Sequence, residues 1–174
     1  GTRSDGATFA GYAIRQGASA VLATPAGAET VRSAIGTPPV PVFMAAQPRQ
    51  VLAHAAARFY ARQLETMIAV TGTNGKTSVT QFVRQIWERL GHRAAALGTT
   101  GITGAGFQGP LGMTTPEPVT LHRTLADLAE RGCTHAAIEA SSHGLAQYRI
   151  DGVRLAAAAL TNVTRDHMDY HLDF

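Results

Sequence analysis

A short segment bracketed by glycines and ending in lysine and hydroxyl side chains is the part of this chain best suited to bind phosphate. It follows an apolar run and consists of Gly72, Thr73, Asn74, Gly75, Lys76, Thr77 and Ser78. Backbone N–H groups of such a loop, and the N-terminus of a following helix, attract phosphate, and glycine lets the backbone approach it closely. Lys76 can then reach the β- and γ-phosphates of a nucleotide, and the Thr77 hydroxyl can ligate Mg²⁺.

The spacing of this segment differs from the common P-loop pattern, which places a glycine at the position that Val70 holds. The segment is therefore a shorter variant that begins at Gly72. A glycine-rich turn with a solvated lysine is the alternative interpretation. Phosphate binding is favoured because a strand-like run precedes the loop and a helical pattern follows it, as the mechanism requires.

Polar residues also follow two other strand-like runs. The run over residues 135–138 leads into Glu139, and a later run leads into Asn162 and His167. Ligands of open parallel sheets bind at the carboxyl ends of the strands, and a carboxylate there suits Mg²⁺, which prefers oxygen ligands. Glu139 is therefore predicted to bind a metal, with a solvated carboxylate as the alternative. For His167 a structural or helix-capping role stays open, because a single histidine is a weak signal.

Two threonines, Thr114 and Thr115, stand shortly before a helical pattern over residues 119–131. Their hydroxyls could cap that helix or donate to an anionic ligand, and the spacing alone favours the cap. His167 and His171 are spaced like a zinc-binding pair on a helix. A zinc hydrolase is disfavoured, because no glutamate follows His167 as it does in the His-Glu-x-x-His pattern.

An α/β framework is needed to bring these segments together. From residue 66 onward, strand-like runs at 67–71, 94–97, 135–139 and 155–160 alternate with helical patterns at 77–90 and 119–131. Such alternation predicts a parallel sheet with helices on both faces. Residues 99–112 fit either an irregular loop or a short hairpin. The preceding part, residues 1–65, reads as the remainder of a small α/β domain, with strands at 18–23 and 40–44, a turn at 24–27, and helices at 8–16 and from Pro48.

Composition narrows the class of protein. The 174 residues are 45% hydrophobic and 16% charged, as expected for a packed globular chain. No apolar run approaches the roughly 20 residues of a membrane-spanning helix, so no membrane insertion is expected. The single cysteine, Cys133, excludes an internal disulfide framework. The net charge of +3 comes from scattered residues, and an aromatic content of 6% is low for base stacking, which favours a small anionic substrate over nucleic acid.

In this order, the motifs resemble those of the Mur ligases, and most closely the MurE-type branch of that family. The resemblance is carried by residues 71–78, 114–116, 139–145 and 160–171, and by an N-terminal segment that includes Asp5 and Gly6. It implies that residues 1–65 are the remainder of an N-terminal UDP-substrate-binding domain. Residues 66–174 would be the first part of the central ATP-binding domain. We expect the chain to be truncated at both ends, without the C-terminal amino-acid-binding domain.

The resemblance implies ATP-dependent amide formation during peptidoglycan precursor synthesis in the bacterial cytoplasm. The enzyme would add a third amino acid, meso-diaminopimelate rather than L-lysine, to UDP-N-acetylmuramoyl-L-Ala-D-Glu through an acyl phosphate. The alternatives are a cyanophycin or folylpolyglutamate synthetase, which share the phosphate loop, and a non-catalytic module that binds UDP-muramyl peptide or nucleotide. Residues 139–145 and 162–171 favour the MurE-type branch.

Site roles are also implied by the resemblance. Lys76, Glu139 and His167 would be catalytic, and Thr77, Glu139 and His167 would hold metal. The phosphate loop, residues 72–78, and Asn162 would bind ATP. The UDP-sugar dipeptide would be bound by Thr114, Thr115, Ser141, Gln147 and Arg149, with Thr2, Arg3 and Ser4 at its uridine end. The carbamylated lysine of the family would lie beyond Phe174.

Overall fold

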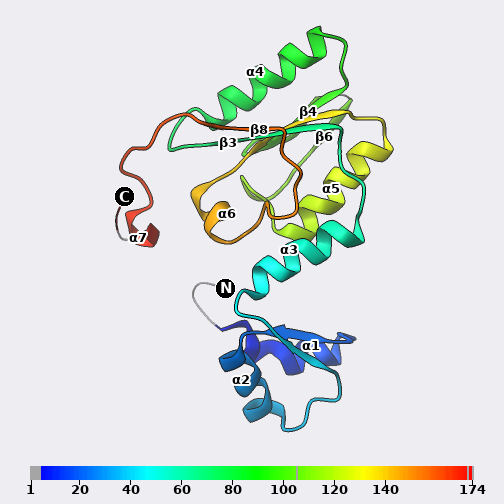
Figure 1. The fold of residues 1–174 in the computed structure, drawn as a ribbon, viewed down its shortest axis with the longest axis vertical. Coiled ribbons are helices and arrows are strands. Elements are labelled where there is room, and N and C mark those ends of the chain that lie inside the picture. The colour runs from blue at the N-terminus through cyan, green and yellow to red at the C-terminus, as the bar shows by residue number, and fades with distance from the viewer. Residues whose placement is uncertain (1–4, 105, 172, 174) are drawn as a thin grey trace. The chain divides into compact units, whose positions relative to one another are not determined.

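The structure is a computed structural model that describes residues 5–104, 106–171 and 173. It divides into two compact units, Gly1–Val51 and Leu52–Phe174 (Figure 1). Helix α3 (Pro48–Phe59) runs across the division between them. No helix in the described ranges is both long enough and apolar enough to cross a membrane.

The first unit is a small α/β arrangement. Its elements are the 3-10 helix η1 (Gly6–Phe9), α1 (Ala10–Arg15), β1 (Val21–Ala23), α2 (Pro25–Ile35) and β2 (Val42–Met44), and the two strands pair in parallel. Helix α2 replaces the turn predicted at residues 24–27. The Thr24 hydroxyl accepts a hydrogen bond from the Gly27 N–H at 3.0 Å and Pro25 opens the helix, so these residues start a helix instead of reversing the chain.

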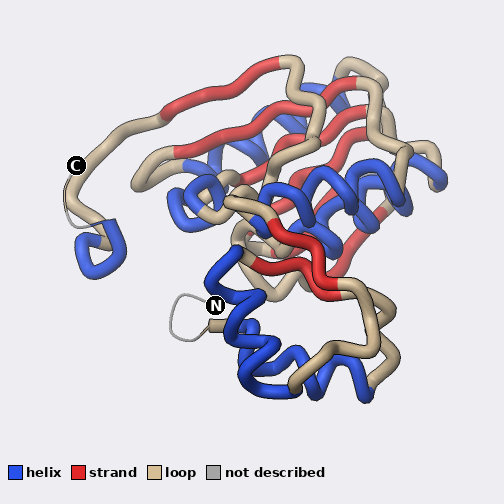
Figure 2. Tube along the Cα trace, turned by 60° about the horizontal axis from the view of Figure 1, so that its bottom comes forward, coloured by secondary structure: helices blue, strands red, loops and turns tan. Residues whose placement is uncertain are grey.

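A mixed sheet forms the centre of the second unit. Its strands are β3 (Thr66–Thr71), β4 (Ala94–Gly98), β5 (Gly101–Gly104), β6 (Phe107–Gly109), β7 (His135–Glu139) and β8 (Ala157–Leu160), in the order β6-β5-β4-β7-β3-β8. Strands β4, β7, β3 and β8 are parallel, whereas β5 and β6 form an antiparallel hairpin beside β4 (Figure 2). The glycine-rich residues 99–112 therefore contain a hairpin, one of the two structures predicted for them.

Helices cover the sheet on both sides. Helix α4 (Lys76–Arg89) lies on one face, and α5 (Pro118–Glu130) lies on the other with the short α6 (Ser142–Ala146) (Figure 1). A last short helix, α7 (Met168–His171), follows β8. The predicted α/β class, a parallel-dominated sheet between helices, is confirmed.

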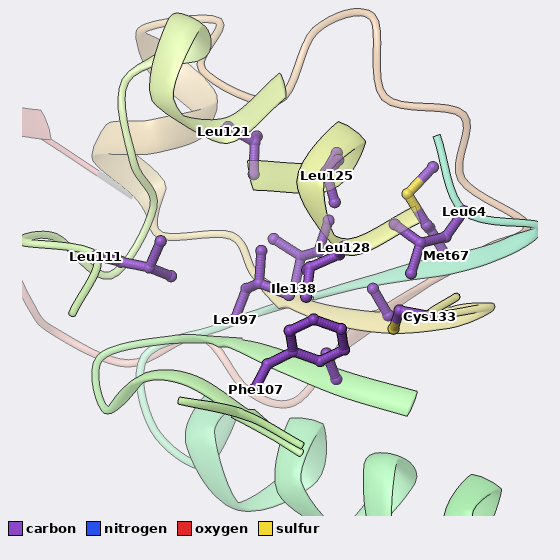
Figure 3. Packing of buried hydrophobic residues seen from close by; sticks show 12 residues of the cluster. Leu64, Met67, Leu97, Phe107, Leu111, Leu121, Leu125, Leu128, Cys133 and Ile138 are labelled. Atoms are coloured by element: carbon purple, nitrogen blue, oxygen red, sulfur yellow. The ribbon is translucent and has the colours of Figure 1, made fainter. Parts of the chain in front are cut away.

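The core of this unit lies between α5 and the sheet. Leu121, Leu125 and Leu128 are at most 2% exposed and share one face of α5, as the spacing of four and then three residues predicts. They pack toward Leu97 of β4 and Ile138 of β7 (Figure 3). This packing holds α5 against the sheet whose strands end in the polar residues of the candidate site.

Shortening one core side chain tests this packing. Leu125→Ala is expected to lower the free energy of unfolding by about 3 kcal/mol, because the removed methyl groups leave a cavity under the helix. Urea denaturation of the purified chain measures the change. Val119→Ala, on the same helix but 42% exposed, is the matched control and should cost less than about 1 kcal/mol. Equal losses from both variants would contradict the core described above.

Two buried histidines make stability depend on pH. Burial lowers the pKa of His122 below its usual 6.5, and burial followed by the charge of His92 lowers the pKa of His135. The unfolded chain therefore binds more protons than the folded chain in mildly acidic solution. The free energy of unfolding should be fully retained above pH 6.5 and should decrease as the pH falls below it. Urea midpoints across this range should fall less steeply for His122→Gln, and an unchanged slope would contradict the assignment.

Candidate active site

The phosphate loop connects the end of β3 to the start of α4, as its mechanism requires. Gly72 and Gly75 have φ angles of 129° and 88°, in the region that favours glycine. A Cβ atom on Gly72 would lie 2.1 Å from the Thr161 Oγ1 atom, so a side chain there would collide with the segment that follows β8. The local sequence thus determines both the shape of the loop and its close contact with that segment.

Asn162, which follows β8, holds the loop in place. Its backbone carbonyl accepts from the Thr73 N–H at 2.9 Å, and its side-chain oxygen accepts from the Asn74 N–H at 3.1 Å. Its side-chain nitrogen donates to the Asn74 carbonyl at 3.1 Å. The structure therefore places Asn162 against residues 72–78, where its amide shapes the backbone of the loop.

The ammonium group of Lys76 lies over the loop. Its Nζ atom donates to the backbone carbonyls of Gly72 at 2.6 Å and Thr73 at 3.0 Å. These two hydrogen bonds keep the Lys76 ammonium group close to the loop, whose backbone N–H groups would face a phosphate. Ser78, in the first turn of α4, is exposed.

Glu139 ends β7 and is 2% exposed. Its Oε2 atom accepts from the Thr77 hydroxyl at 3.0 Å and from the Thr99 hydroxyl at 3.1 Å. Its Oε1 atom accepts from the Thr99 backbone N–H at 3.1 Å. The structure thus joins Thr77 and Glu139, two of the three predicted metal ligands, and adds Thr99, which the sequence analysis did not single out.

Because Gly98 has no side chain, the Glu139 carboxylate can lie close to its backbone. A Cβ atom on Gly98 would lie 2.0 Å from Glu139 Oε1, so Gly98→Ala must displace the carboxylate. Substituting a residue that orients a metal ligand typically lowers the affinity for the metal by about 10–100-fold. We expect a corresponding rise in the Mg²⁺ concentration needed for half-maximal ATP turnover by the full-length gene product.

The matched control for this variant is Gly109→Ala. A Cβ atom on Gly109, in the adjoining hairpin, would meet nothing within 4 Å. Its Mg²⁺ requirement should equal that of the unaltered protein. An unchanged Mg²⁺ requirement in Gly98→Ala would show that the position of Glu139 does not matter for metal binding.

Thr114 and Thr115 have different surroundings. Thr115 is 1% exposed, and its hydroxyl donates to the Glu139 carbonyl at 2.9 Å and accepts from the Ser141 N–H at 2.8 Å. The Thr114 hydroxyl is 3.0 Å from that of Thr99. The helix-cap interpretation is wrong, because α5 begins after Glu117 and no described side chain caps it.

Arg149 carries positive charge beside these threonines. Its Nη1 atom donates to the Thr115 carbonyl at 2.8 Å, and its Nη2 atom donates to Gln147 Oε1 at 2.8 Å and pairs with Glu117 at 3.1 Å. Its Nε atom is buried and has no partner among the described residues. The guanidinium is thus held in a fixed orientation by protein groups, and a planar anion such as a carboxylate would have to replace one of them, for example the exposed Glu117.

His167 lies in the segment after β8, whereas Glu139 ends β7, and the nearest described partners of the His167 side chain are Asp166 and His143. Its side chain is 53% exposed, and its Nε2 atom lies 3.6 Å from Asp166 Oδ2. Its ring meets that of His143 edge-on, with centroids 4.6 Å apart. The described residues contain no group of three or more His, Cys, Asp or Glu side chains arranged to hold a metal.

Two neighbouring pockets are lined by several of these residues, although neither is lined by Thr77 or Glu139. One, of about 400 Å³, is lined by the loop residues Gly72, Thr73 and Lys76 and by Asn162. The other, of about 620 Å³, is lined by Thr99, Thr114, Thr115 and Arg149. Both pockets are lined by Ser141 and His167, so a ligand in one can approach a ligand in the other there. The predicted uridine-site residues Thr2, Arg3 and Ser4 lie outside the described residues.

Comparison with known proteins adds independent information. The family model of the Mur ligase middle domain matches residues 70–174. The UDP-N-acetylmuramoyl-L-alanyl-D-glutamate–2,6-diaminopimelate ligases of Rhizobium meliloti and Brucella melitensis are 55% and 56% identical to the chain, each over 98% of this chain and 34% of the relative. A solved structure of a ligase of that name is 29% identical, with a TM-score of 0.71 over 87% of this chain and 35% of the other. The chain therefore spans about a third of the length of the relatives it matches.

Proposed function

Because the chain belongs to the Mur ligase family, we propose that it forms the ATP site and part of the acceptor site of an amide-forming ligase. The substrate would be UDP-N-acetylmuramoyl-L-Ala-D-Glu and the added amino acid meso-diaminopimelate, in the bacterial cytoplasm. One observation carries the proposal: Thr77 of the nucleotide loop and Thr99 of the neighbouring pocket donate to the same Glu139 carboxylate. The nucleotide and the acceptor would thus meet at one group.

The chemistry needs two anions to approach each other. The acceptor carboxylate attacks the γ-phosphorus of ATP, which gives an acyl phosphate and ADP. The amine of the diamino acid then attacks the acyl carbon, and inorganic phosphate leaves. Lys76 would neutralise charge on the phosphates during the first step, which is mainly a matter of positioning and electrostatics.

The donor set at Glu139 fits Mg²⁺, which prefers hard oxygen ligands shared with substrate phosphates. Thr77 and Glu139 supply a hydroxyl and a carboxylate oxygen 3.0 Å apart. When bound there, Mg²⁺ would offset phosphate charge. His167, at the junction of the pockets, is the candidate ligand of a second metal ion.

The second pocket is proposed to bind the UDP-muramyl dipeptide. Arg149 would face a carboxylate or phosphate, while Thr114 and Ser141 would contact neutral polar groups. Gln147 lines neither of the two pockets, so it would act through its hydrogen bond to Arg149. Thr115 would act through its backbone and through its hold on Ser141, because its hydroxyl is already bonded within the protein. The first unit, with Thr2, Arg3 and Ser4, is proposed to belong to the domain that binds the uridine end.

Calorimetric titration of UDP-N-acetylmuramoyl-L-Ala-D-Glu into the chain tests this acceptor site. We expect saturable binding that Arg149→Gln weakens by about tenfold or more, because a hydrogen bond to a charged group contributes about 1.5–3 kcal/mol. Arg62→Gln is the control, since the Arg62 side chain makes a single surface ion pair within the described residues, at 3.8 Å with Glu130. Circular dichroism should show both variants folded. Equal affinities in both variants would refute the assignment of Arg149.

A further inference from the structure

Thr99 lies between the candidate metal ligand and the candidate acceptor pocket, yet no step of the proposed reaction uses it. It follows β4 in the turn that leads to β5, and the residue is exposed. Its backbone N–H and its hydroxyl donate to the two oxygens of Glu139, each at 3.1 Å, and its hydroxyl is 3.0 Å from the Thr114 hydroxyl. We propose that Thr99 is a positioning residue that orients the Glu139 carboxylate and the Thr114 hydroxyl together.

The two contacts to Glu139 fix the plane of its carboxylate. A single hydrogen bond would let the group rotate about its last torsion, whereas donors to both Oε1 and Oε2 hold it in one orientation. The Thr77 hydroxyl also donates to Oε2. The remaining lone pairs of the carboxylate are thereby directed for a cation, as supporting hydrogen bonds do for metal ligands generally.

The hydrogen bonds that link Thr114, Thr99 and Glu139 determine whether the Thr114 hydroxyl can donate to a ligand. The carboxylate form of Glu139, which is the form that ligates a metal, can only accept hydrogen bonds, and a hydroxyl has one proton to give. Thr99 gives its proton to Glu139, so the 3.0 Å contact requires Thr114 to donate to Thr99. Thr114 then presents only lone pairs to the pocket. The ligand group that it contacts must be a hydrogen-bond donor, an amide N–H or a hydroxyl, and not the reacting carboxylate.

This inference rests on the proposed function and refines its substrate site. It divides the pocket into an anion-binding part at Arg149 and a donor-binding part at Thr114. Because Thr99 is exposed and is not a member of the hydrophobic cluster of the core, replacing its hydroxyl should affect the site much more than the fold.

The test compares Thr99→Val, Thr99→Ser and the control Thr103→Val in the full-length gene product. Thr103 lies on β5, and its hydroxyl bonds to Gln81, away from Glu139. Thr99→Val should raise both the Mg²⁺ concentration for half-maximal activity and the KM for UDP-N-acetylmuramoyl-L-Ala-D-Glu by about tenfold. Thr99→Ser, which keeps the hydroxyl, and Thr103→Val should stay within about twofold of the unaltered protein.

A double variant tests the link to Thr114. In a Thr114→Val background, Thr99→Val should cause no further rise in the KM for the UDP substrate, because there is no hydroxyl left to orient. Additive increases in KM would overturn the proposed link.

A Thr99→Val protein with unaltered KM and Mg²⁺ requirement would overturn the positioning role. If Thr99→Val melts at a lower temperature than the unaltered protein, Thr99→Ala serves as the second variant. A lower melting temperature with an unchanged Mg²⁺ requirement in both variants would show that Thr99 supports the fold alone. Absence of amide formation in the unaltered protein would instead refute the proposed function.

Discussion

Lys76→Met in the full-length gene product is expected to lower the rate of ATP-dependent amide formation by about 10²–10³-fold, the usual cost of removing one preorganised charge-stabilising group. Lys76 is the only lysine of the 174-residue chain, and it sits in the phosphate loop. Methionine keeps most of the length of the side chain but cannot donate to phosphate. Because its Nζ atom contacts only the loop carbonyls of Gly72 and Thr73 among the described residues, the fold should survive the change.

A coupled assay of ADP release measures this loss of rate. Calorimetric titration with the UDP-muramyl dipeptide then shows whether the loss includes weaker binding of that substrate. Lys76→Met should bind the UDP-muramyl dipeptide as the unaltered protein does, because Lys76 lines the loop pocket and not the acceptor pocket. Arg62→Met removes a cation whose side chain is 69% exposed and should leave the rate unchanged. A rate within about threefold of normal in Lys76→Met would contradict the account of the loop.

Glu139→Gln is expected to have an effect of similar size, a loss of about 10²-fold or more in amide formation. The amide has nearly the shape of the carboxylate but lacks its charge, and one of its two positions becomes a donor facing the Thr77 and Thr99 hydroxyls. The Mg²⁺ concentration required for activity should therefore rise steeply, while nucleotide-free protein stays folded.

Titration of activity with Mg²⁺ measures this second effect. Glu130→Gln is the control. Glu130 is at the end of α5, its side chain is 57% exposed, and among the described residues it pairs with Arg62 alone. A Glu139→Gln protein with a normal Mg²⁺ requirement would remove Glu139 from the metal site, even if its maximal rate were low.

Local motifs made part of the site predictable. The strand–loop–helix order around residues 72–78 could be predicted because strand, glycines, lysine and helix are contiguous, and the structure shows those elements in that order. Glu139 could be placed at the same sheet edge, because parallel strands end together. The pairing of β3 with β7 and β8 then brings Glu139 and Asn162 to the loop.

Other features depend on contacts that the sequence does not display. Thr99 is one threonine in a glycine-rich stretch, and it reaches Glu139 only because β4 pairs with β7. Thr115 looked like a helix cap or ligand residue, but its hydroxyl bonds to backbone groups of Glu139, the last residue of β7, and of Ser141, which follows it. Helix α2 was missed because Thr24 and Pro25 suit both a turn and a helix start, and only the capping bond at Gly27 distinguishes them.

The proposed function is tested by the reaction itself, carried out with the full-length gene product. Supplied with ATP, Mg²⁺, UDP-N-acetylmuramoyl-L-Ala-D-Glu and meso-diaminopimelate, it should form the UDP-muramyl tripeptide, identified by mass, with equal amounts of ADP and phosphate. L-lysine in place of meso-diaminopimelate should give a lower rate. ATP hydrolysis without tripeptide, or binding of both ligands without ADP formation, would contradict the proposal that this chain belongs to an amide-forming ligase.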